Sequence, residues 1–344
     1  AGHDVTVAIE YYTLKTPNEG FLNDVGIPVK SFFDDTYKTR TSNPFVKLKR
    51  KLTMQKNAES WLISLIEEER PDVIHVHLGL LHRLAPIADK LKGIKLVYTC
   101  HNEPEFFFKG NGTPEQEAAR TLIDKCGMTV TALHEPMAER LKEFFPNADI
   151  RVLYNPVNID FYKNPQKSRE EVRQELNIPQ KAFLVGHVGR FSEQKNHDFL
   201  LEVFDEILKI RSDAFLLMIG EGELKNKIED KVKEKGLEKS TLILSNRADM
   251  ANLYSAMDVF VLPSVFEGFP ITMLEAQSAG LPCYISQAVT DTVAATEKVY
   301  KVPEGTMPPH WARIVTGEEK MRPLFKHMDI TEFDINNIIT GLTE

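Results

Sequence analysis

The stretch FEGFPITMLEAQSAGLPCYIS, residues 266–286, follows an apolar run, VFVLPS at residues 259–264. It contains two glutamates, Glu267 and Glu275, separated by seven residues. An apolar run that ends in a turn and continues into a helical pattern and a second short apolar run predicts a strand, a helix and another strand. Gly280 is expected just after the helix, because glycine tolerates the left-handed conformation that ends many helices. We therefore expect Glu267 in the turn at the carboxyl end of a strand and Glu275 about one turn into the helix.

The same alternation of apolar runs and amphipathic segments continues through the whole chain. Continuous apolar runs are typical of parallel strands covered on both faces, and their alternation with helices indicates βαβ units. In NHDFLLEVFDEILKI, residues 196–210, apolar residues recur at helical spacing, and Asn196 is the expected N-cap. The predicted strands are VTVAIE (5–10), VIHVH (73–77), KLVYTC (95–100), MTVTAL (128–133), IRVLY (150–154), FLVGHVG (183–189), AFLLMIG (214–220), TLILS (241–245), DVFVLPS (258–264) and PCYIS (282–286).

The pattern predicts an α/β fold with two doubly wound, parallel-sheet domains. A chain of 344 residues exceeds the usual size of a single core. A Pro/Asn-rich stretch at residues 155–165 separates the two strand series. We expect an N-terminal domain over residues 1–154 and a C-terminal domain over residues 155–344.

The bulk composition narrows the class of protein. The chain is 42% hydrophobic and 27% charged, as globular proteins are, and its net charge of −8 argues against nucleic-acid binding. No apolar run reaches 18 residues, and the N-terminal AGHDVTVAIE has no basic start or long apolar stretch, so neither a transmembrane helix nor a signal peptide is predicted. Cys100, Cys126 and Cys283 have no metal-ligand spacing. We expect free thiols in a reducing compartment, and therefore a cytoplasmic location.

The segment after the predicted strand at residues 183–189 is a candidate anion site. Gly189 allows a tight turn or a close backbone approach, Arg190 offers a planar charged fork, and Lys195 offers a mobile charge just before a helix start. The N–H groups of a helix N-terminus also favour anions. The alternative is a solvated loop with two surface cations.

The two glutamates are candidates for binding a sugar. Carboxylates accept paired hydrogen bonds from vicinal hydroxyls, which both a ribose and a hexose present. The alternative is that Glu267 is an ordinary turn residue and Glu275 a surface helix residue.

Histidines mark the ends of two predicted strands in the first half. His101, followed by Asn102, could bind a sugar hydroxyl or act in acid–base chemistry, or it could be a capping or core histidine. His75 and His77 share one face of a strand. No carboxylate or cysteine cluster accompanies them in the sequence, so we expect no metal site.

With these residues the chain resembles the GT-B glycosyltransferases, and among them glycosyltransferase family four (group 1). The resemblance is strongest in GRFSEQKNHDFLLEVF, MIGEGELK and LYSAMDVFVLPSVFEGFPITMLEAQSAGLPCYIS, and weaker in PDVIHVH and VYTCHN. The AQSAGLPCYIS continuation is similar to the exopolysaccharide and capsule branch. The resemblance implies two Rossmann-like domains facing an interdomain cleft, with the acceptor on the N-terminal side and a nucleotide-sugar donor on the C-terminal side.

The resemblance also implies residue roles. Arg190 and Lys195 are expected to hold the diphosphate, Glu275 the ribose hydroxyls, and Glu267 the donor sugar, with Arg247 near the nucleobase. The implied donor-binding residues are Gly189, Arg190, Lys195, Arg247, Glu267, Gly268, Phe269, Pro270, Ile271, Thr272 and Glu275, and the implied catalytic residues are His101, Glu267, Arg190 and Lys195.

Family members are retaining enzymes, and the residues suit transfer without a metal. The sequence has no Asp-x-Asp motif. Two cations and a helix N-terminus can neutralise a departing diphosphate, and a carboxylate favours an oxocarbenium-like state. We expect no cofactor and no metal, with a UDP-linked donor suggested by the branch. A front-face mechanism is the working hypothesis, and covalent attack by Glu267 stays open.

The sequence departs from the family pattern at its start. Family members place a strand, a Gly-Gly loop and a helix before a segment like GHDVTV, which occupies residues 2–7 here. We expect that a first βα unit is missing from the sequence, through a fragment or through unnumbered residues. If it is absent from the protein, activity is in doubt.

A basic segment suggests where the protein binds its acceptor. No acid interrupts the basic residues Lys38, Arg40, Lys47, Lys49, Arg50, Lys51 and Lys56. Such a segment, with interleaved apolar residues, predicts contact with an anionic membrane through Lys47, Lys49, Arg50 and Lys51, or else a solvated face. The aromatics of FFFKG (106–110) belong to the core or border an acceptor with a lipid tail. The hypothesis is a glycan or polyprenyl-linked acceptor at the inner face of a membrane.

Other function classes stay open. An inactive or truncated sugar-nucleotide-binding protein would keep the same fold. A sugar-nucleotide epimerase would need acid–base residues on both faces of the sugar, and only His101 is a clear candidate. A sugar phosphorylase is disfavoured, because no lysine stands in a recognisable pyridoxal-phosphate context.

Overall fold

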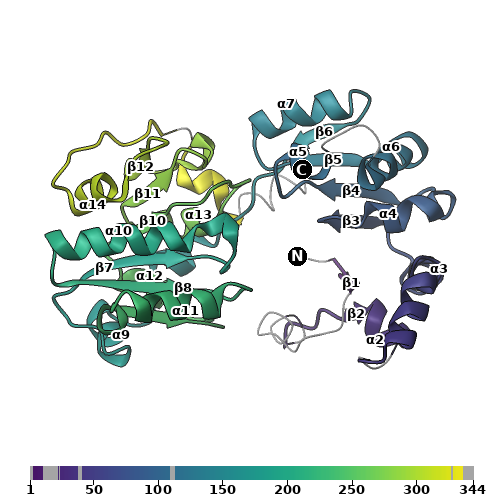
Figure 1. The fold of residues 1–344 in the computed structure, drawn as a ribbon. Helices are drawn as coiled ribbons and strands as arrows, with labels where there is room; N and C mark the ends of the chain where they lie inside the picture. Colours follow the sequence, from purple (N-terminus) through teal and green to yellow (C-terminus); the bar gives the residue numbers. More distant parts are fainter. Residues whose placement is uncertain are drawn as a thin grey trace. The chain divides into compact units, whose positions relative to one another are not determined.

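The computed structural model describes residues 3–10, 22, 24–37, 41–108, 113–326 and 328–335, apart from the side chains of residues 106 and 107. Contacts divide the chain into two compact units, Ala1–Leu153 and Tyr154–Glu344. Each unit is built around parallel sheets of its own (Figure 1).

The second unit contains a six-stranded parallel sheet with the order β12-β11-β10-β7-β8-β9. From β7 the chain winds outward to β8 and β9, returns to β10 beside β7, and winds outward on the other side. The sheet is therefore doubly wound, and its winding reverses between β7 and β10. The strands are β7 (Phe183–Val188), β8 (Ala214–Ile219), β9 (Thr241–Leu244), β10 (Val259–Leu262), β11 (Cys283–Ser286) and β12 (Val299–Val302).

Helices pack on this sheet in two groups. One group shares a single apolar cluster with the sheet, and α10 and α14 lie side by side within it (Figure 1). In the other group, α12 contacts α8, α9 and α13. The first group is α10 (His197–Ile210), α11 (Lys225–Glu234) and α14 (Pro308–Thr316), and the second is α8 (Ile159–Lys163), α9 (Arg169–Glu175), α12 (Met250–Ala256) and α13 (Ile271–Ser278). Short 3₁₀ turns are η2 (Glu193–Lys195), η3 (Glu238–Ser240), η4 (Asp291–Val293) and η5 (Ile330–Phe333).

Within its described residues, the first unit has two parallel sheets rather than one. Its larger sheet has the order β3-β4-β5-β6, while β1 pairs with β2 separately. The pair is tied to neighbouring helices by Thr6 Oγ1, which donates to Glu69 at 2.9 Å, and by an ion pair of 2.7 Å between Arg83 and Glu10. The strands are β1 (Val7–Ile9), β2 (Val29–Ser31), β3 (Val73–His77), β4 (Lys95–Thr99), β5 (Thr129–Ala132) and β6 (Ile150–Val152).

The helices of the first unit begin at recognisable signals. In the 26-residue α3, the Asn43 side chain accepts hydrogen bonds from the N–H groups of Phe45 and Val46, and Pro44 takes the first turn. The helices are α2 (Phe32–Tyr37), α3 (Pro44–Glu69), α4 (Leu81–Leu84), the 3₁₀ helix η1 (Ala85–Lys90), α5 (Pro104–Phe108), α6 (Pro114–Cys126) and α7 (Glu135–Phe144).

The predicted strands are confirmed, since each of the ten apolar runs contains one. The sequence pattern misses β2 and β12, both of which are short and carry a lysine. Gly280 follows α13 with a φ of 80°, as predicted. Asn196 does precede α10, but it has left-handed backbone angles and its side chain does not cap the helix. Its amide donates instead to the Pro263 carbonyl at 3.3 Å.

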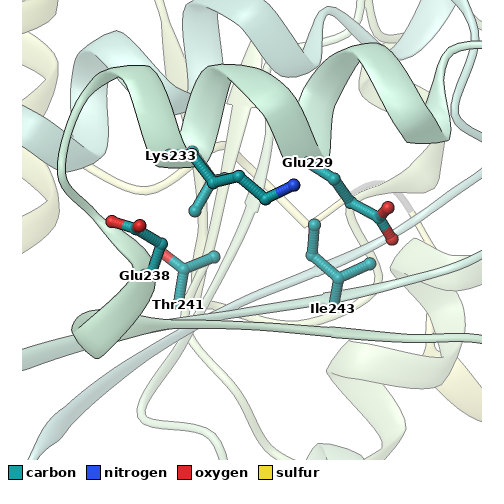
Figure 2. Close-up of a pocket in the computed structure, with 6 residues that line it drawn as sticks. Glu229, Lys233, Glu238, Thr241 and Ile243 are labelled. Carbon is teal, nitrogen blue, oxygen red and sulfur yellow. The ribbon is translucent and has the colours of Figure 1, made fainter.

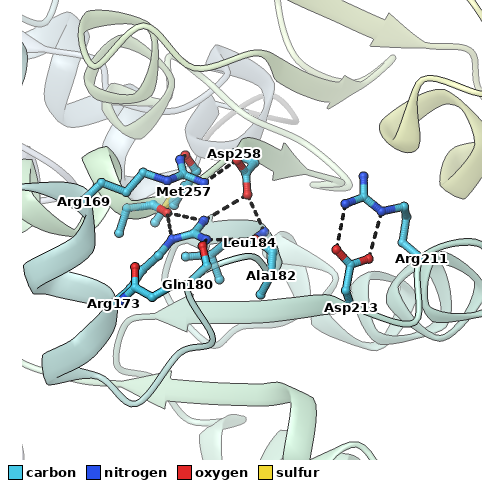
Figure 3. A network of polar contacts seen from close by, with 10 residues as sticks. Arg169, Arg173, Gln180, Ala182, Leu184, Arg211, Asp213, Met257 and Asp258 are labelled. Atoms are coloured by element: carbon cyan, nitrogen blue, oxygen red, sulfur yellow. Dashed lines mark hydrogen bonds and ion pairs between the residues drawn. The ribbon is translucent and has the colours of Figure 1, made fainter.

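The amino edge of the six-stranded sheet is held by a buried polar network (Figure 3). The Arg173 guanidinium, 1% exposed, donates to the carbonyls of Gln180, Ala182 and Ala256 and to Asp258. Asp258 also accepts from the Leu184 N–H at 2.7 Å and from Arg169 at 2.5 Å. These contacts join α9 to the beginnings of β7 and β10. Nearby, Arg211 and Asp213 form a two-bonded pair (Figure 3).

Two further expectations from composition are tested by the structure. Cys100, Cys126 and Cys283 are free thiols, and burial raises the pKa of each. Within the described residues, no helix is both long enough and apolar enough to cross a membrane.

Candidate active site

The centre of the six-stranded sheet brings two of the predicted sites together. Because β7 and β10 are neighbours and run in parallel, the loops that follow them leave the same edge of the sheet. In doubly wound sheets, ligands bind at this edge where the winding reverses. The loop after β7 carries Gly189, Arg190 and Lys195, and the loop after β10 carries Glu267.

A buried ion pair joins these two loops. Lys195 Nζ lies 2.6 Å from Glu267 Oε1, and the two side chains are only 13% and 5% exposed. Gln194 supports the contact, since its amide donates to the Phe266 carbonyl at 3.0 Å and lies 3.4 Å from Glu267 Oε2. The backbone N–H of Val265 donates in turn to the Gln194 carbonyl at 2.8 Å. The sequence predicted Lys195 and Glu267 as site residues, but not their contact.

Position 189 requires glycine because neighbouring atoms pack closely against it, and not because its φ is unusual. A Cβ at Gly189 would lie 3.1 Å from His187 Nε2 and 3.1 Å from Lys195 Cδ. A Cβ on Gly220, after β8, would lie 2.0 Å from the Gly189 carbonyl oxygen. The backbone after β7 is therefore wedged between the lysine stem and the next strand end, which fixes the loop that carries Lys195.

Arg190 does not contact the ion pair of Lys195 and Glu267. Its side chain is 72% exposed, and its guanidinium pairs with Glu223 at 3.0 Å. Arg247, in the loop after β9, is held by two hydrogen bonds to Asp249, at 2.7 and 2.6 Å. The sequence predicted both arginines as donor-binding residues but not their carboxylate partners. The structure does not bring either guanidinium into contact with Lys195 or Glu267.

The start of α13 provides the third part of the candidate site. Pro270 occupies the N-cap position, so the first N–H groups of α13 have no side-chain cap. Phe269 is buried and packs against Tyr154 and Phe333, which anchors the turn that contains Gly268. Ile271 is 41% exposed, while the Thr272 hydroxyl is buried and has no hydrogen-bond partner.

Glu275 has two tyrosine partners that the sequence did not reveal. The Tyr162 hydroxyl lies 2.6 Å from Oε1, and the Tyr254 hydroxyl lies 2.7 Å from Oε2. Burial and the Glu275 charge raise the pKa of both tyrosines, so each phenol is protonated and donates. Tyr162 comes from α8 and Tyr254 from α12, so three helices meet at this carboxylate.

Buried polar atoms without partners occur beside these loops. His187 donates from Nδ1 to the Val261 carbonyl at 2.8 Å, and its Nε2, facing Gly189, has no partner. Burial, reinforced by the nearby His197, lowers the pKa of His187 well below its ordinary value, so the ring is neutral. The Ser264 hydroxyl, just after β10, is also buried and unpartnered. The signal for His187 and Ser264 in the sequence was only their position near strand ends.

In the first unit, His101 belongs to a row of histidines. His101 Nε2 lies 2.7 Å from His77 Nδ1, and the His77 ring lies tilted by 35° beside that of His75, with centroids 4.2 Å apart. His75 Nε2 lies 2.7 Å from the Thr99 hydroxyl. Burial lowers the pKa of all three rings, that of His75 to about 4, so they are neutral near pH 7. Such an arrangement can accept or relay a proton.

The described residues contain no cluster of three or more histidine, cysteine or acidic side chains placed to hold a metal ion. His75 and His77 do share a face, as predicted. Of the FFFKG segment, Phe108 alone has a described side chain, and it is buried against Phe144 and Phe145 as part of the core. The other positions of this segment lie outside the described side chains.

The basic part of α3 is largely exposed. Lys47, Lys49 and Lys51 are exposed, as are Phe45, Leu48 and Leu52 at 82%, 56% and 78%. Arg50 differs, because its guanidinium lies over the Tyr37 ring and donates to the Tyr37 carbonyl at 3.3 Å. Lys38 and Arg40 lie outside the described residues.

A hollow of about 200 Å³ lies elsewhere, beside α11 and β9 (Figure 2). Its lining contains none of the predicted site residues. Its charged side chains carry both signs and none of them is buried, so we assign no catalytic role to it. The lining consists of Glu229, Val232, Lys233, Glu238, Thr241 and Ile243.

Comparison with known proteins identifies the family. The model of Glycosyltransferase Family 4 matches residues 1–161, and that of Glycosyl transferases group 1 matches residues 168–299. The chain is 30% identical over 290 residues to UDP-Gal:alpha-D-GlcNAc-diphosphoundecaprenol alpha-1,3-galactosyltransferase of Escherichia coli, an alignment that spans 78% of this chain and 72% of the relative. The chain belongs to glycosyltransferase family 4, group 1.

Solved structures agree on the fold of this glycosyltransferase. HepE of Anabaena, in complex with UDP and glucose, superimposes with a TM-score of 0.72 at 19% identity, covering 99% of this chain and 98% of HepE. WaaG, a glycosyltransferase involved in lipopolysaccharide biosynthesis, superimposes with a TM-score of 0.67 at 16% identity, covering 92% of this chain and 82% of WaaG. The glycosyltransferase has the GT-B fold that the sequence predicted.

Proposed function

We propose that this glycosyltransferase transfers a sugar, with retention of configuration and without a metal ion, from a UDP-linked donor to a glycan or polyprenyl-linked acceptor of a cell-surface polysaccharide. The observation that carries the proposal is the buried contact between Lys195 and Glu267 at the centre of the doubly wound sheet. A lysine and a carboxylate on adjacent strand ends provide one group for a diphosphate and one for the sugar bound to it.

The positively charged side chains are proposed to stabilise the negative charge that develops on the leaving group. Breaking a sugar–phosphate bond leaves negative charge on the diphosphate, and positive groups held nearby lower the barrier. Lys195 supplies an ammonium that the Gly189 loop fixes in place. The N–H groups at the start of α13, with the Thr272 hydroxyl, supply further donors. Arg190 is exposed and can exchange its surface pairing with Glu223 for a phosphate.

Glu267 is proposed to act on the donor sugar. When a diphosphate takes over Lys195, the Glu267 carboxylate becomes available to sugar hydroxyls and to the positive charge that grows at the anomeric carbon. The nearby turn at Gly268, Phe269 and Pro270 offers peptide groups to the same sugar. In this scheme the sugar–phosphate bond breaks, and the acceptor hydroxyl bonds to the anomeric carbon from the face that the diphosphate leaves. The hydroxyl proton passes to an oxygen of the departing diphosphate, and the configuration is retained.

The UDP assignment draws on HepE, whose crystal structures contain UDP, glucose and UDP-glucose. Glu275 is proposed to bind the ribose hydroxyls and Arg247 to lie near the base. These assignments place the donor on the C-terminal domain, residues 155–344, and the acceptor on the N-terminal domain, residues 1–154. His101 is proposed to contact the acceptor or the donor sugar.

Nucleotide binding is tested by calorimetry with UDP, GDP and ADP, with and without EDTA. UDP is expected to bind most tightly, EDTA to leave its affinity unchanged, and Lys195→Ala to weaken it at least about tenfold. Lys301→Ala is the matched control, because Lys301 is 12% exposed, pairs with Asp291, and lies on the edge strand β12. The donor assignment would be overturned if no nucleoside diphosphate bound, and the metal-independent mechanism would be overturned if binding or turnover required a divalent metal. NMR of the first-formed product determines whether the configuration is retained.

The acceptor proposal draws on the E. coli relative, which is named for a diphosphoundecaprenol-linked acceptor. The exposed lysines and apolar side chains at the start of α3 suit an anionic bilayer surface. In flotation with vesicles containing anionic lipid, replacing Lys47, Lys49 and Lys51 by Gln is expected to abolish binding. Replacing the exposed Lys227, Lys233 and Lys235 by Gln removes the same charge and should leave binding unchanged. Equal loss in both variants, or no binding by the unaltered protein, would refute the membrane contact.

A further inference from the structure

The two tyrosines on Glu275 saturate half of its carboxylate. An ionised carboxylate has about four lone-pair sites, two on each oxygen. The Tyr162 hydroxyl, 2.6 Å away, occupies one site on Oε1, and the Tyr254 hydroxyl, 2.7 Å away, occupies one site on Oε2. One acceptor site is left on each oxygen, which is the number that a vicinal diol requires.

The tyrosines are themselves held rigidly. The Tyr254 side chain is fully buried, and its ring meets the Tyr162 ring edge to face with centroids 5.6 Å apart. Tyr162 is further packed against Phe161 at 5.0 Å. With one donor on each oxygen, coming from different helices, the carboxylate cannot rotate about its last side-chain bond without losing both hydrogen bonds.

We propose that Tyr162 and Tyr254 are positioning residues that orient the Glu275 carboxylate so that one acceptor site on each oxygen faces the two vicinal hydroxyls of the nucleotide ribose. The proposal rests on the proposed binding of a nucleoside diphosphate and goes beyond it by assigning ribose selectivity to the tyrosine pair. Preorganisation is the physical reason. A carboxylate already fixed in place loses little rotational freedom when it binds the diol, and its hydrogen bonds to charged oxygen are strong.

The chemistry makes a prediction about the ligand as well as the protein. The Tyr254 hydroxyl also lies 3.4 Å from the Thr272 carbonyl, farther than its 2.7 Å contact with Glu275. In the proposal both tyrosine hydroxyls affect binding through Glu275 and the ribose hydroxyls, so their removal should matter for UDP and not for 2′,3′-dideoxy-UDP. A merely structural role would weaken both nucleotides equally. An alternative in which Tyr162 occupies the place of the ribose predicts the opposite sign, because its removal would strengthen UDP binding.

The experiment compares the affinities of UDP and 2′,3′-dideoxy-UDP by calorimetry for the unaltered protein, Tyr162→Phe, Tyr254→Phe and the double variant. The unaltered protein is expected to prefer UDP by at least about tenfold, and each single variant to lose most of that preference while its affinity for the dideoxy nucleotide changes by less than about twofold. Tyr300→Phe is the matched control: Tyr300 stacks on Tyr284 at the sheet edge and should leave both affinities unchanged. Thermal unfolding of each variant checks that it is folded.

The possible outcomes test nucleotide binding and the positioning role of the tyrosines separately. If the unaltered protein binds no nucleoside diphosphate, the proposed function fails and this proposal fails with it. If UDP binds but the dideoxy nucleotide binds equally well, both the positioning role and the Glu275 ribose assignment are overturned, while transfer from a UDP-linked donor stands. If the Tyr162→Phe and Tyr254→Phe variants lose affinity for both nucleotides alike or gain affinity for UDP, the positioning role alone is overturned.

Discussion

Breaking the Lys195–Glu267 contact from one side is expected to destabilise the second unit, whereas removing both charges should cost far less. The two charged atoms are 2.6 Å apart, and the side chains are 13% and 5% exposed. With an effective dielectric constant of about 20, the attraction at this distance is roughly 6 kcal/mol, and the loss of hydration of two ions offsets most of it. The pair as a whole therefore contributes little to the free energy of unfolding, but either charge would be costly to bury without the other.

Replacing one partner leaves the other buried without compensation. Lys195→Met and Glu267→Gln are each expected to lower the free energy of unfolding by about 3–5 kcal/mol. Lys195→Met should be the costlier change, because Glu267 has less access to water than Lys195 has. The double variant is expected to lose only about 1–2 kcal/mol, so the two effects should be strongly non-additive.

The two tryptophans allow the second unit to be followed alone. Trp61 belongs to the first unit and Trp311, buried on α14, to the second. In a Trp61→Phe background, urea unfolding monitored by fluorescence therefore reports on the unit that contains the ion pair. Lys209→Met is the control, since its pairing with Glu206 is at the surface and should contribute less than about 1 kcal/mol. Single variants that cost under about 1 kcal/mol each, with additive effects, would refute the reasoning.

Three further substitutions test other parts of the second unit. Arg173→Met should lower the free energy of unfolding by about 3–5 kcal/mol, because it leaves three carbonyls without this donor and removes one of the two arginines that pair with Asp258, yet calorimetry should find the UDP affinity of the folded protein unchanged. Burial, together with the charge of Lys195, lowers the pKa of His197 to about 4. On acidification, His197 is therefore protonated in the unfolded chain at a higher pH than in the folded protein. The free energy of unfolding should fall as the pH drops from about 6.5 to 4, by about 3 kcal/mol for this residue. Urea titrations of His197→Gln should show a weaker dependence of stability on pH. Gly220→Ala forces its Cβ against the backbone of Gly189, and should reduce both stability, by about 1–3 kcal/mol in urea unfolding, and UDP affinity.

The strands could be predicted from sequence because the signal is local. A run such as AFLLMIG is apolar throughout since both of its faces are covered, and that requirement is visible without knowing the partners. An edge strand such as β12 has a neighbour on one side only, β11, and so tolerates Lys301, which hides it from the same pattern. The division of the first unit into two sheets depends on which strands pair, and pairing is not a local property.

The candidate site was predictable in position but not in contacts. Placing Lys195 and Glu267 at strand ends needed only the order of runs and turns. Their ion pair depends on β7 and β10 being neighbours, although 72 residues separate the two side chains in sequence. The tyrosines on Glu275 come from helices 113 and 21 residues away, and the tyrosine residues carry no motif of their own. Long-range contacts of this kind follow from the fold and not from spacing.

The two edges of the six-stranded sheet differ in how their buried polar groups are arranged, although Thr241 Oγ1, at the start of β9, also lacks a partner at the amino edge. At the amino edge, every N–H of the Arg173 guanidinium has an acceptor, and Asp258 joins the starts of two strands to α9. At the carboxyl edge, His187 Nε2 and the hydroxyls of Ser264 and Thr272 are buried without partners. A buried polar atom without a partner costs stability, so such atoms persist where another function needs them. Since both edges belong to the same strands, the Arg173 network can hold the sheet in register at one edge while the other keeps donors and acceptors for a ligand. The unpartnered atoms at the carboxyl edge support the proposal that the donor binds there, independently of any motif.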